Sequence, residues 1–348
     1  MNKINQELYP LKKNISLIIA IPTLNSGKTL HITMNSILNQ KKHYFDTRVI
    51  LLDSGSTDKT KEIFFSYKDN LNLQFKNIGK SSIGEARNYA ITEFIADYLI
   101  FLDSDDALTS DRLYEDYLII NSRQEIDFIY GDAFQIDKNS IQNSYYIKSC
   151  SEAGKYQFLN MPFNLSCTTI SRDFLLGNKI YFINGRKGRL GEDWRFINEI
   201  NLKGNYLYKS IPRVIINSRG DSHTQDYLKC DLNITKMEFI CFQFREISSG
   251  KHFLKSCYFS FQVQASFCLS LVNIIKYTNP RKIKFLISSF KKILNMYLSI
   301  SPIYLLINLI FFPISIYLIL FVHRRSSTSV QRRELDDFIY KQICKKLS

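Results

Sequence analysis

Residues 98–106 read YLIFLDSDD, an apolar run that ends in three acidic residues within four positions. The apolar part has the length and the aromatic and branched content of a buried β-strand. Aspartate favours turns after strands, which explains one acid but not three, because crowded carboxylates repel one another unless a cation neutralises them. Hard divalent cations take oxygen ligands and bridge carboxylates to substrate phosphates. We therefore interpret residues 103–106 as part of a binding site at the carboxyl end of a strand.

The chain on both sides of this stretch alternates short apolar runs with helical patterns. We predict strands at residues 15–21, 48–52, 73–78, 98–102 and 127–130. We predict helices at residues 29–39, 59–67, 83–96 and 112–121. Ser82 and Glu85 are spaced as a capping box at the start of the third helix. The alternation indicates a Rossmann-like α/β fold, with a mostly parallel sheet covered by helices on both faces. Residues 140–235 are less regular, and we expect them to form a mixed extension of the same domain.

Acidic residues follow two more of the predicted strands. The segment Asp53-Ser54-Gly55-Ser56-Thr57-Asp58 comes directly after one of them, and Gly131-Asp132 comes after another. In open α/β sheets, ligands bind beyond the carboxyl ends of the strands. We therefore expect these acids to gather with residues 103–106 at one edge of the sheet.

The net charge of +14 is distributed unevenly along the 348 residues. Residues 1–235 hold 29 Lys and Arg against 27 Asp and Glu, whereas residues 236–348 hold 17 against 5. The basic residues of the second part flank uncharged apolar stretches, which suits lipid headgroups better than a nucleic acid. We therefore expect membrane lipids and no nucleic acid among the partners.

The same part of the chain has helical apolar patterns. Residues 253–275 are apolar at helical spacing, residues 282–300 are amphipathic, and residues 293–322 contain no charged residue. The uncharged run could cross a bilayer, but Asn308 and Pro313 interrupt it, and a single crossing would oppose the positive-inside tendency. We predict that residues 236–348 attach to the membrane without crossing it, with both ends in the cytosol. A simple crossing and packing on the catalytic domain are the alternatives.

The seven cysteines are odd in number, widely spaced and without zinc-type spacing. A disulfide framework within one chain would leave one of them unpaired. We interpret them as reduced thiols in the cytosol.

Two other nucleotide-binding classes are disfavoured by single positions. Ser26-Gly27-Lys28-Thr29 has the sequence that ends a P-loop, but the first glycine of that motif would fall at Pro22, which has no N–H to donate to a phosphate. No G-x-G-x-x-G follows the first predicted strand, which argues against a nicotinamide-binding fold.

With these features in place, the chain resembles a family 2 glycosyltransferase of the GT-A fold, similar to bacterial surface-polysaccharide glycosyltransferases. The resemblance covers roughly residues 14–225. It is carried by five segments in order: Pro22-Thr23-Leu24-Asn25, Asp53-Ser54-Gly55-Ser56-Thr57-Asp58, Gly84-Glu85-Ala86-Arg87-Asn88-Tyr89-Ala90, Asp103-Ser104-Asp105 and Gly191-Glu192-Asp193-Trp194. We therefore expect a GT-A catalytic domain at residues 14–235, followed by a helical, membrane-associating region at residues 236–348.

The resemblance implies a nucleotide diphosphate sugar as the donor. Pro22, Thr23 and Asp53 would line its base and ribose, and Asn25 belongs to the same binding segment. Arg87 would lie near the donor pocket.

The resemblance also implies a divalent metal, Mn²⁺ or Mg²⁺. Asp103 would approach the ribose or the diphosphate, and Asp105 would hold the metal together with Asp103. His223 would complete the metal site as in some members of the family, or else it is a surface-loop histidine.

The acid pair Glu192-Asp193 sits where the family places its catalytic acids. Asp193 would be the general base that takes the proton of an acceptor hydroxyl, because a hydroxyl is a poor nucleophile until it loses its proton. A single displacement on the far face of the sugar would invert the anomeric centre.

The resemblance implies a metal-dependent hexosyltransferase-type enzyme at the cytoplasmic face of the cell membrane. Its acceptor would be a glycan or a lipid-linked glycan in surface polysaccharide biosynthesis. The alternatives are a polyprenyl-phosphate sugar synthase and a catalytically silent GT-A scaffold protein.

Overall fold

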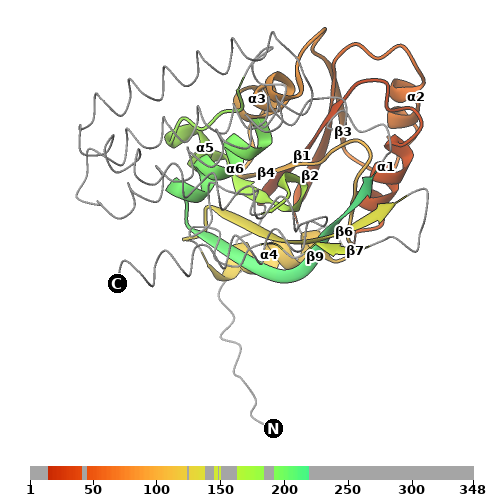
Figure 1. Ribbon diagram of the computed structural model, residues 1–348. Helices are drawn as coiled ribbons and strands as arrows, with labels where there is room; N and C mark the ends of the chain where they lie inside the picture. The colour runs from red at the N-terminus through yellow and green to blue at the C-terminus, as the bar shows by residue number, and fades with distance from the viewer. Residues whose placement is uncertain are drawn as a thin grey trace, which may run out of the picture. The chain divides into compact units, whose positions relative to one another are not determined.

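The computed structural model describes residues 15–40, 45–123, 125–137, 145–147, 149, 163–183 and 192–218 (Figure 1). These residues form one mixed sheet with helices packed against it. The strands are β1 (Ser16–Thr23), β2 (Asp46–Asp53), β3 (Leu73–Asn77), β4 (Tyr98–Phe101), β5 (Ala107–Leu108), β6 (Phe128–Asp137), β7 (Tyr145–Ile147), β8 (Thr169–Ser171) and β9 (Tyr206–Ser218). The helices are α1 (Leu30–Leu38), α2 (Thr60–Phe65), α3 (Ile83–Glu93), α4 (Arg112–Ser122), the 3₁₀ helix η3 (Leu165–Cys167), α5 (Arg172–Gly177) and α6 (Glu192–Lys203).

The first half of the sheet is parallel, in the order β3-β2-β1-β4. The strands and helices predicted up to residue 121 are confirmed, with ends shifted by a few residues. Strand β1 is buried along almost its whole length, as its continuous apolar sequence requires of a strand covered on both faces. Thr23 pairs with Asp53 in the register of β1 and β2, and Ala20 pairs with Phe101 in that of β1 and β4. The carboxyl ends of these strands therefore meet at one edge.

The second half of the sheet is mixed, as predicted for residues 140–235, so the prediction that the sheet as a whole is mostly parallel is wrong. Strand β8 lies antiparallel between β4 and β6, β9 runs parallel to β6, and both β5 and β7 pair antiparallel. The regular alternation of strand and helix ends after α4. Among the described residues, no α-helix lies between β6, β7 and β8, and β7 and β8 both pair antiparallel with β6.

Helices cover both faces of the sheet, as predicted (Figure 1). Apolar residues of α3, α5 and α6 pack with one set of alternating strand residues, which includes Ile18, Ala20 and Ile50. Apolar residues of α1, α2 and α4 pack with the opposite set, which includes Leu17 and Ile19. Because side chains alternate across a strand, each face builds its own core and the sheet edge between them carries the polar loops.

Helix α3 begins with the predicted capping box. The Ser82 N–H donates to Glu85 Oε2 at 2.7 Å, and the Glu85 N–H donates to Ser82 Oγ at 3.2 Å. These bonds satisfy two of the main-chain groups that a helix start leaves without partners. The cap fixes where α3 begins and therefore which of its residues face the sheet edge.

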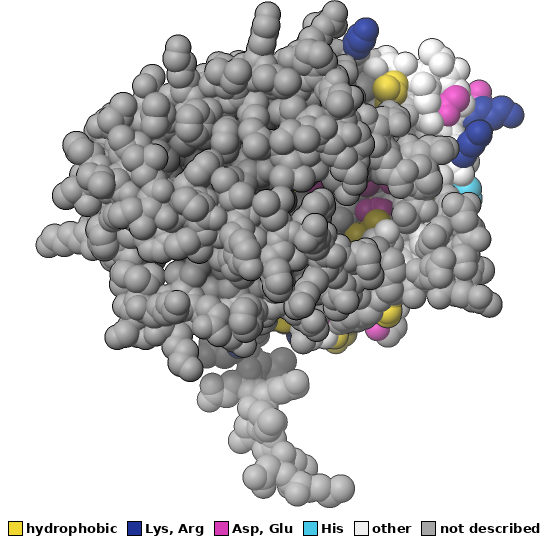
Figure 2. Space-filling view, in the orientation of Figure 1, with side chains coloured by type: hydrophobic (Ala, Val, Ile, Leu, Met, Phe, Trp, Pro, Cys, Tyr) yellow, Lys and Arg dark blue, Asp and Glu magenta, His cyan; other side chains and the backbone are white. Residues whose placement is uncertain are grey.

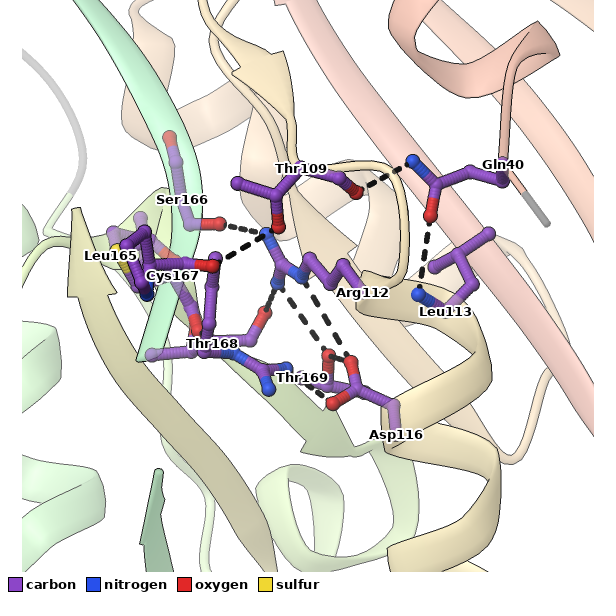
Figure 3. A network of polar contacts seen from close by, with 12 residues as sticks. Gln40, Thr109, Arg112, Leu113, Asp116, Leu165, Ser166, Cys167, Thr168 and Thr169 are labelled. Atoms are coloured by element: carbon purple, nitrogen blue, oxygen red, sulfur yellow. Dashed lines mark hydrogen bonds and ion pairs between the residues drawn. The ribbon is translucent and has the colours of Figure 1, made fainter. Parts of the chain in front are cut away.

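A buried polar cluster holds α4 against the second half of the sheet (Figure 3). Asp116 pairs with both Arg112 and Arg213, and accepts a hydrogen bond from Thr169 Oγ1 at 2.6 Å. Arg112 also donates to the main-chain oxygens of Ser166 and Thr168. Burial and the neighbouring Arg213 charge lower the pKa of Arg112 to about 10. Two guanidiniums thus share one carboxylate, and main-chain oxygens of η3 and its surroundings supply the remaining acceptors.

Cys167 of η3 lies beside this cluster as a buried free thiol. Burial raises the pKa of Cys167 to about 12. It is therefore a protonated structural thiol, as predicted for the cysteines in general; the other six lie outside the described residues.

The described surface along α1 and α2 carries both signs of charge. Figure 2 shows Lys and Arg side chains beside Asp and Glu on the side where Figure 1 places these helices. Within the described ranges, no helix is both long and apolar enough to span a membrane. Residues 236–348 and His223 lie outside the described residues, so their predicted roles stay predictions.

Candidate active site

Two turns interlock where β1 and β2 end. Asn25 has a φ of 52°, in the left-handed region that asparagine tolerates better than most residues. Its N–H donates to Ser56 Oγ at 2.8 Å, and its Oδ1 accepts from the Thr57 N–H at 2.9 Å. Asp53 is buried and accepts from the Ser56 N–H and the Ser56 hydroxyl. Two of the predicted nucleotide-binding segments therefore form one rigid unit.

The P-loop-like segment is part of this unit, and its glycine is hydrogen-bonded to an aspartate. The Gly27 N–H donates to Asp58 Oδ2 at 2.9 Å, and a Cβ on Gly27 would lie only 2.7 Å from the same oxygen. Burial opposes the ionisation of Asp58, but hydrogen bonds from Thr60 and Gly27 outweigh it and lower its pKa. A glycine at this position lets the Asp58 side chain approach closely, and the Gly27 N–H is already hydrogen-bonded to it.

A chain of three hydroxyls joins the first turn to residues 103–106, which we call the acidic loop. Thr23 Oγ1 donates to Ser26 Oγ at 2.7 Å, and Ser26 Oγ lies 2.7 Å from Ser104 Oγ. Thr23 and Ser26 are buried, and Ser104 is partly exposed. The turn after β1 and the loop after β4 are therefore held together through side chains.

The acids of the acidic loop have different environments. Asp103 and Asp105 are partly exposed, whereas Asp106 is buried. Burial, reinforced by the charges of Asp103 and Asp105, raises the pKa of Asp106 well above its usual range. The Thr33 hydroxyl donates to the main-chain oxygen of Asp106 at 2.8 Å. The buried Asp106 therefore holds the loop against the protein interior, whereas Asp103 and Asp105 remain partly exposed.

Arg87 joins the acidic loop to the start of α6. Its Nη2 lies 2.7 Å from Asp103 Oδ1, and its Nη1 lies 3.4 Å from Glu192 Oε1. The guanidinium is buried and lies over the ring of Phe182, 5.3 Å from its centroid. Because the carboxylates come from segments far apart in sequence, Arg87 fixes the distance between the two parts of the site.

The two acids at the start of α6 both have raised pKa values. Burial and the neighbouring Asp193 charge raise the pKa of Glu192 to about 7, against the opposing effect of Arg87. Asp193 as a residue is partly exposed, but its carboxyl group is surrounded by protein atoms. This loss of water raises the pKa of Asp193, while the charge of Arg87 lowers it. Asp193 Oδ1 accepts from the Trp194 N–H at 2.7 Å. Glu192 is therefore the paired member of the two acids, and Asp193 is the more accessible one.

Sequence reasoning missed the role of Asn88, which follows Arg87 directly. Its side-chain amide donates to the Phe182 main-chain oxygen at 2.8 Å and accepts from the Phe182 N–H at 2.7 Å. A Cβ on Gly84 would lie 2.7 Å from the Ile183 main-chain oxygen. The segment at residues 84–90 therefore binds residues 182–183 on one side while Arg87 reaches the acids on the other.

The structure brings most of the predicted site residues into one region. Pro22, Thr23, Asn25 and Asp53 belong to the interlocked turns at the ends of β1 and β2. Arg87 contacts both Asp103 and Glu192. Asp105 lies two residues after Asp103, and Asp193 directly follows Glu192. Among the described residues, no three His, Cys, Asp or Glu side chains are grouped as a metal site.

The sequence that forms most of this site matches a known protein family. Residues 18–178 match the model of the glycosyl transferase family 2. These residues are therefore similar to family 2 glycosyltransferases. The match includes the interlocked turns, Arg87 and the acidic loop, and it ends before α6.

Several bacterial glycosyltransferases are similar to this part of the chain. The poly(ribitol-phosphate) β-N-acetylglucosaminyltransferase TarS of Staphylococcus aureus is 28% identical over 194 residues, which cover 54% of this chain and 33% of TarS. The glycosyltransferase GlyG of Streptococcus pneumoniae is 26% identical over 208 residues, covering 55% of this chain and 65% of GlyG. The matched region therefore spans a third of TarS and less than two thirds of GlyG.

A third relative is a glucosyltransferase of Escherichia coli. This UDP-Glc:α-D-GlcNAc-diphosphoundecaprenol β-1,3-glucosyltransferase, WfgD, is 27% identical over 165 residues, covering 47% of this chain and 62% of WfgD. Among solved structures, TarS 1-349 in complex with UDP-GlcNAc has a TM-score of 0.63 at 16% identity and covers 89% of this chain and 92% of that one. At that identity, the structural match shows the GT-A-like fold alone.

Proposed function

We propose that this chain transfers a sugar from a nucleotide diphosphate sugar to a hydroxyl of a glycan, with inversion of the anomeric centre, in bacterial surface polysaccharide synthesis. The observation that carries the proposal is the bridge that Arg87 makes between Asp103 of the acidic loop and Glu192 of the acid pair. The bridge holds the acidic loop, which is the proposed donor-binding element, and the acid pair, which is the proposed proton-accepting element, on either side of one buried cation.

The donor class is supported by the position of the polar loops. The interlocked turns and the acidic loop follow β1, β2 and β4, at the edge where ligands bind in open α/β sheets. The TarS structure with this fold holds UDP-GlcNAc. Thr23, Asn25 and Asp53 would accordingly position the nucleotide, with Pro22 beside them.

The residues present fit a divalent cation shared with the donor. Asp103 and Asp105 are partly exposed oxygen ligands, and Asp103 uses one oxygen for Arg87. Mg²⁺ and similar cations are commonly held by one or two carboxylates plus substrate phosphates. We propose that Asp105, with Asp103, would hold Mn²⁺ or Mg²⁺; His223 is a further candidate outside the described residues. The cation would offset charge on the departing nucleoside diphosphate.

Asp193 is the proposed general base. Asp193 is partly exposed as a residue, and burial of its carboxyl group raises its pKa, so it is a stronger proton acceptor than an ordinary aspartate. It would take the proton of the acceptor hydroxyl as the oxygen attacks the anomeric carbon and the bond to the diphosphate breaks. Glu192, held by Arg87, would orient the start of α6 and keep negative charge near the base.

The proposed acceptor is a lipid-linked glycan at the cytoplasmic face of the membrane, and the names of two relatives and the basic sequence of the C-terminal region support this choice. WfgD is named for an acceptor carried on diphosphoundecaprenol, and TarS for poly(ribitol-phosphate). Residues 236–348, which lie outside the described residues, would supply the attachment through their basic and apolar sequence.

A donor panel tests the proposed function. The full chain is incubated with Mn²⁺ and UDP-, GDP-, ADP- and dTDP-sugars, and thermal stabilisation and release of the nucleotide are measured. We expect one nucleotide class to stabilise the chain and to be released slowly, and EDTA to abolish the release. Asp105→Ala should lose the response, whereas Asp69→Ala, which changes an exposed acid after α2, should retain it. No stabilisation or release with any donor would refute the proposal.

Acceptor and membrane attachment need their own experiment. Transfer is compared on a glycan diphospholipid and on polyprenyl phosphate, and a product on polyprenyl phosphate alone would favour the synthase alternative.

A cysteine added after Ser348 is tested with an impermeant thiol reagent in intact cells, with the unmodified chain as control. We expect no added labelling, because both ends are proposed to be cytosolic; labelling would mean a crossing.

A further inference from the structure

The acidic loop is held by elements from several parts of the chain. Arg87 of α3, Ser26 of the turn after β1 and Thr33 of α1 each contact one of its residues. A further contact comes from Asn217 near the end of β9, more than a hundred residues later. Asn217 lies beyond the part of the chain that matches the family model.

Asn217 contacts two successive residues of the acidic loop. Its side-chain Nδ2 donates to the main-chain oxygen of Asp105, and its main-chain N–H donates to Asp106 Oδ1 at 3.3 Å. The sheet register explains the contact. Ala107 of β5 pairs with Ile215 of β9 in an antiparallel ladder, and continuing this register by two residues sets Asn217 opposite Asp105.

The two hydrogen bonds constrain the direction of the Asp105 side chain. Fixing the main-chain oxygen of Asp105 and the carboxylate of Asp106 sets the peptide between them. The Cα–Cβ bond of Asp105 projects from that constrained backbone. A loop with a freely rotating peptide would present this carboxylate in several directions, only some of which suit a cation shared with Asp103.

The residue type at position 217 matters for a chemical reason. A side-chain amide supplies an N–H donor without charge, which is what a main-chain oxygen beside two carboxylates needs. Aspartate has nearly the same shape, but it would set a further negative oxygen against that main-chain oxygen and the acidic loop. Alanine would remove the donor altogether.

We propose that Asn217 is a positioning residue for the divalent-cation site, which it acts on through the backbone of Asp105 and Asp106. This inference rests on the proposed function, because that function supplies the cation. Asn217 does not contact the cation in this proposal; it presets the direction of the Asp105 carboxylate before the cation and the donor diphosphate arrive.

Direct cation binding tests the proposal without measuring turnover. Mn²⁺ binding to the full chain is followed by electron paramagnetic resonance in the presence of UDP, and UDP binding is measured separately in EDTA by calorimetry. Asn217→Ala and Asn217→Asp are compared with wild type and with Gln135→Ala. Gln135 is a partly exposed residue of β6, opposite Ile216 of β9 in the register, and so a matched control.

We expect both Asn217 variants to weaken Mn²⁺ binding by about 10–100-fold, the usual cost of losing a group that orients a metal ligand. UDP binding in EDTA should stay within about twofold of wild type, and Gln135→Ala should match wild type in both measurements. Asn217→Asp keeps the main-chain contact and the side-chain shape, so it remains informative if Asn217→Ala folds poorly.

Two results would overturn this inference and leave the proposed function standing. In the first, Asn217→Asp binds Mn²⁺ as tightly as wild type. In the second, Asn217→Asp loses Mn²⁺ binding and metal-free UDP binding to the same extent. The second result would mean that Asn217 only supports the fold. If wild type itself binds no Mn²⁺ in the presence of UDP, the cation site of the proposed function fails and this inference fails with it. The outcomes are therefore distinguishable.

Discussion

Arg87 and Glu192, which lie 105 residues apart in the chain, form an ion pair in which Nη1 and Oε1 are 3.4 Å apart. Their side chains are 4% and 10% exposed, so water screens the pair little. Buried charges are costly unless they are paired, and Arg87 has a second carboxylate partner in Asp103 at 2.7 Å. The arginine therefore does two things at once: it neutralises buried negative charge and holds α3, the acidic loop and α6 in one arrangement.

Replacing Arg87 by methionine should destabilise the protein strongly. The variant keeps most of the side-chain volume but leaves Glu192 without its counter-charge, and breaking a buried pair in this way costs about 3–5 kcal/mol of the free energy of unfolding. Arg195→Met is the control, because Arg195 forms a partly exposed pair with Glu199 on α6, and such pairs contribute about 0–1 kcal/mol. Urea unfolding measures both. Equal losses in the two variants would show that the Arg87 pair adds little.

Glu192 should make the stability of the protein depend on pH. Its pKa is raised from 4.5 to about 7 in the folded chain, so between these values the folded state holds a proton that the unfolded state has lost. The contribution of Glu192 to stability therefore falls as the pH rises from 4.5 to about 7 and is constant above that. Asp193 adds to the same trend, because its pKa is raised as well, whereas Arg87 opposes it.

The variant Glu192→Gln removes one titrating group and should flatten this dependence. Its free energy of unfolding, relative to wild type, should increase from about pH 5 to about pH 8. Glu62→Gln, which changes an exposed acid of α2, should show no such trend. Urea unfolding at both pH values measures the difference. A difference that stays constant, or that decreases with pH, would mean that Glu192 is ionised in the folded chain throughout this range.

Much of the first half of the fold was predictable from local patterns. The apolar run before Asp103 forms β4, and the Ser82–Glu85 spacing forms the cap of α3, because both depend on residues close together in sequence. The polar turns after β1, β2 and β4 meet because the carboxyl ends of parallel strands share an edge. These features needed only periodicity and one rule about sheets.

The second half could not be predicted in the same way. Strand β8 has three residues, too short for any periodicity to show, and its place between β4 and β6 makes the sheet mixed. The contact between Asn217 and Asp105 depends on the antiparallel pairing of β5 with β9, which no local pattern contains. Arg213 of β9 likewise reaches Asp116 of α4, which lies 97 residues earlier in the chain.

Asp116→Asn should destabilise the buried cluster of Figure 3. The variant keeps the shape of the side chain but leaves the guanidiniums of Arg112 and Arg213 buried with no shared carboxylate. We expect a loss of about 3–5 kcal/mol in the free energy of unfolding, since an uncompensated buried charge is left behind. Thr169→Val removes one hydrogen bond to the same carboxylate and should cost about 1–3 kcal/mol.

The order of these two variants is the result that matters. Urea unfolding monitored by the fluorescence of Trp194 gives both values. A loss for Asp116→Asn no larger than that for Thr169→Val would show that main-chain oxygens alone satisfy the two arginines.

The last prediction separates the two acids at the start of α6 by their effect on turnover. Asp193→Asn keeps the shape of the side chain but removes the proton acceptor, so turnover should fall by roughly 10²–10⁴, the usual range for the loss of a general base. The affinity for the donor should change little, because the proposed base acts on the acceptor hydroxyl. Glu192→Gln should have a smaller effect on turnover, since Glu192 is the acid that Arg87 already pairs. Initial rates at saturating donor, with donor binding measured in parallel, distinguish the two roles. If Glu192→Gln abolishes turnover while Asp193→Asn transfers at the wild-type rate, then Glu192 is the base; its pKa of about 7 would suit that role, and Arg87 would then tune the base itself.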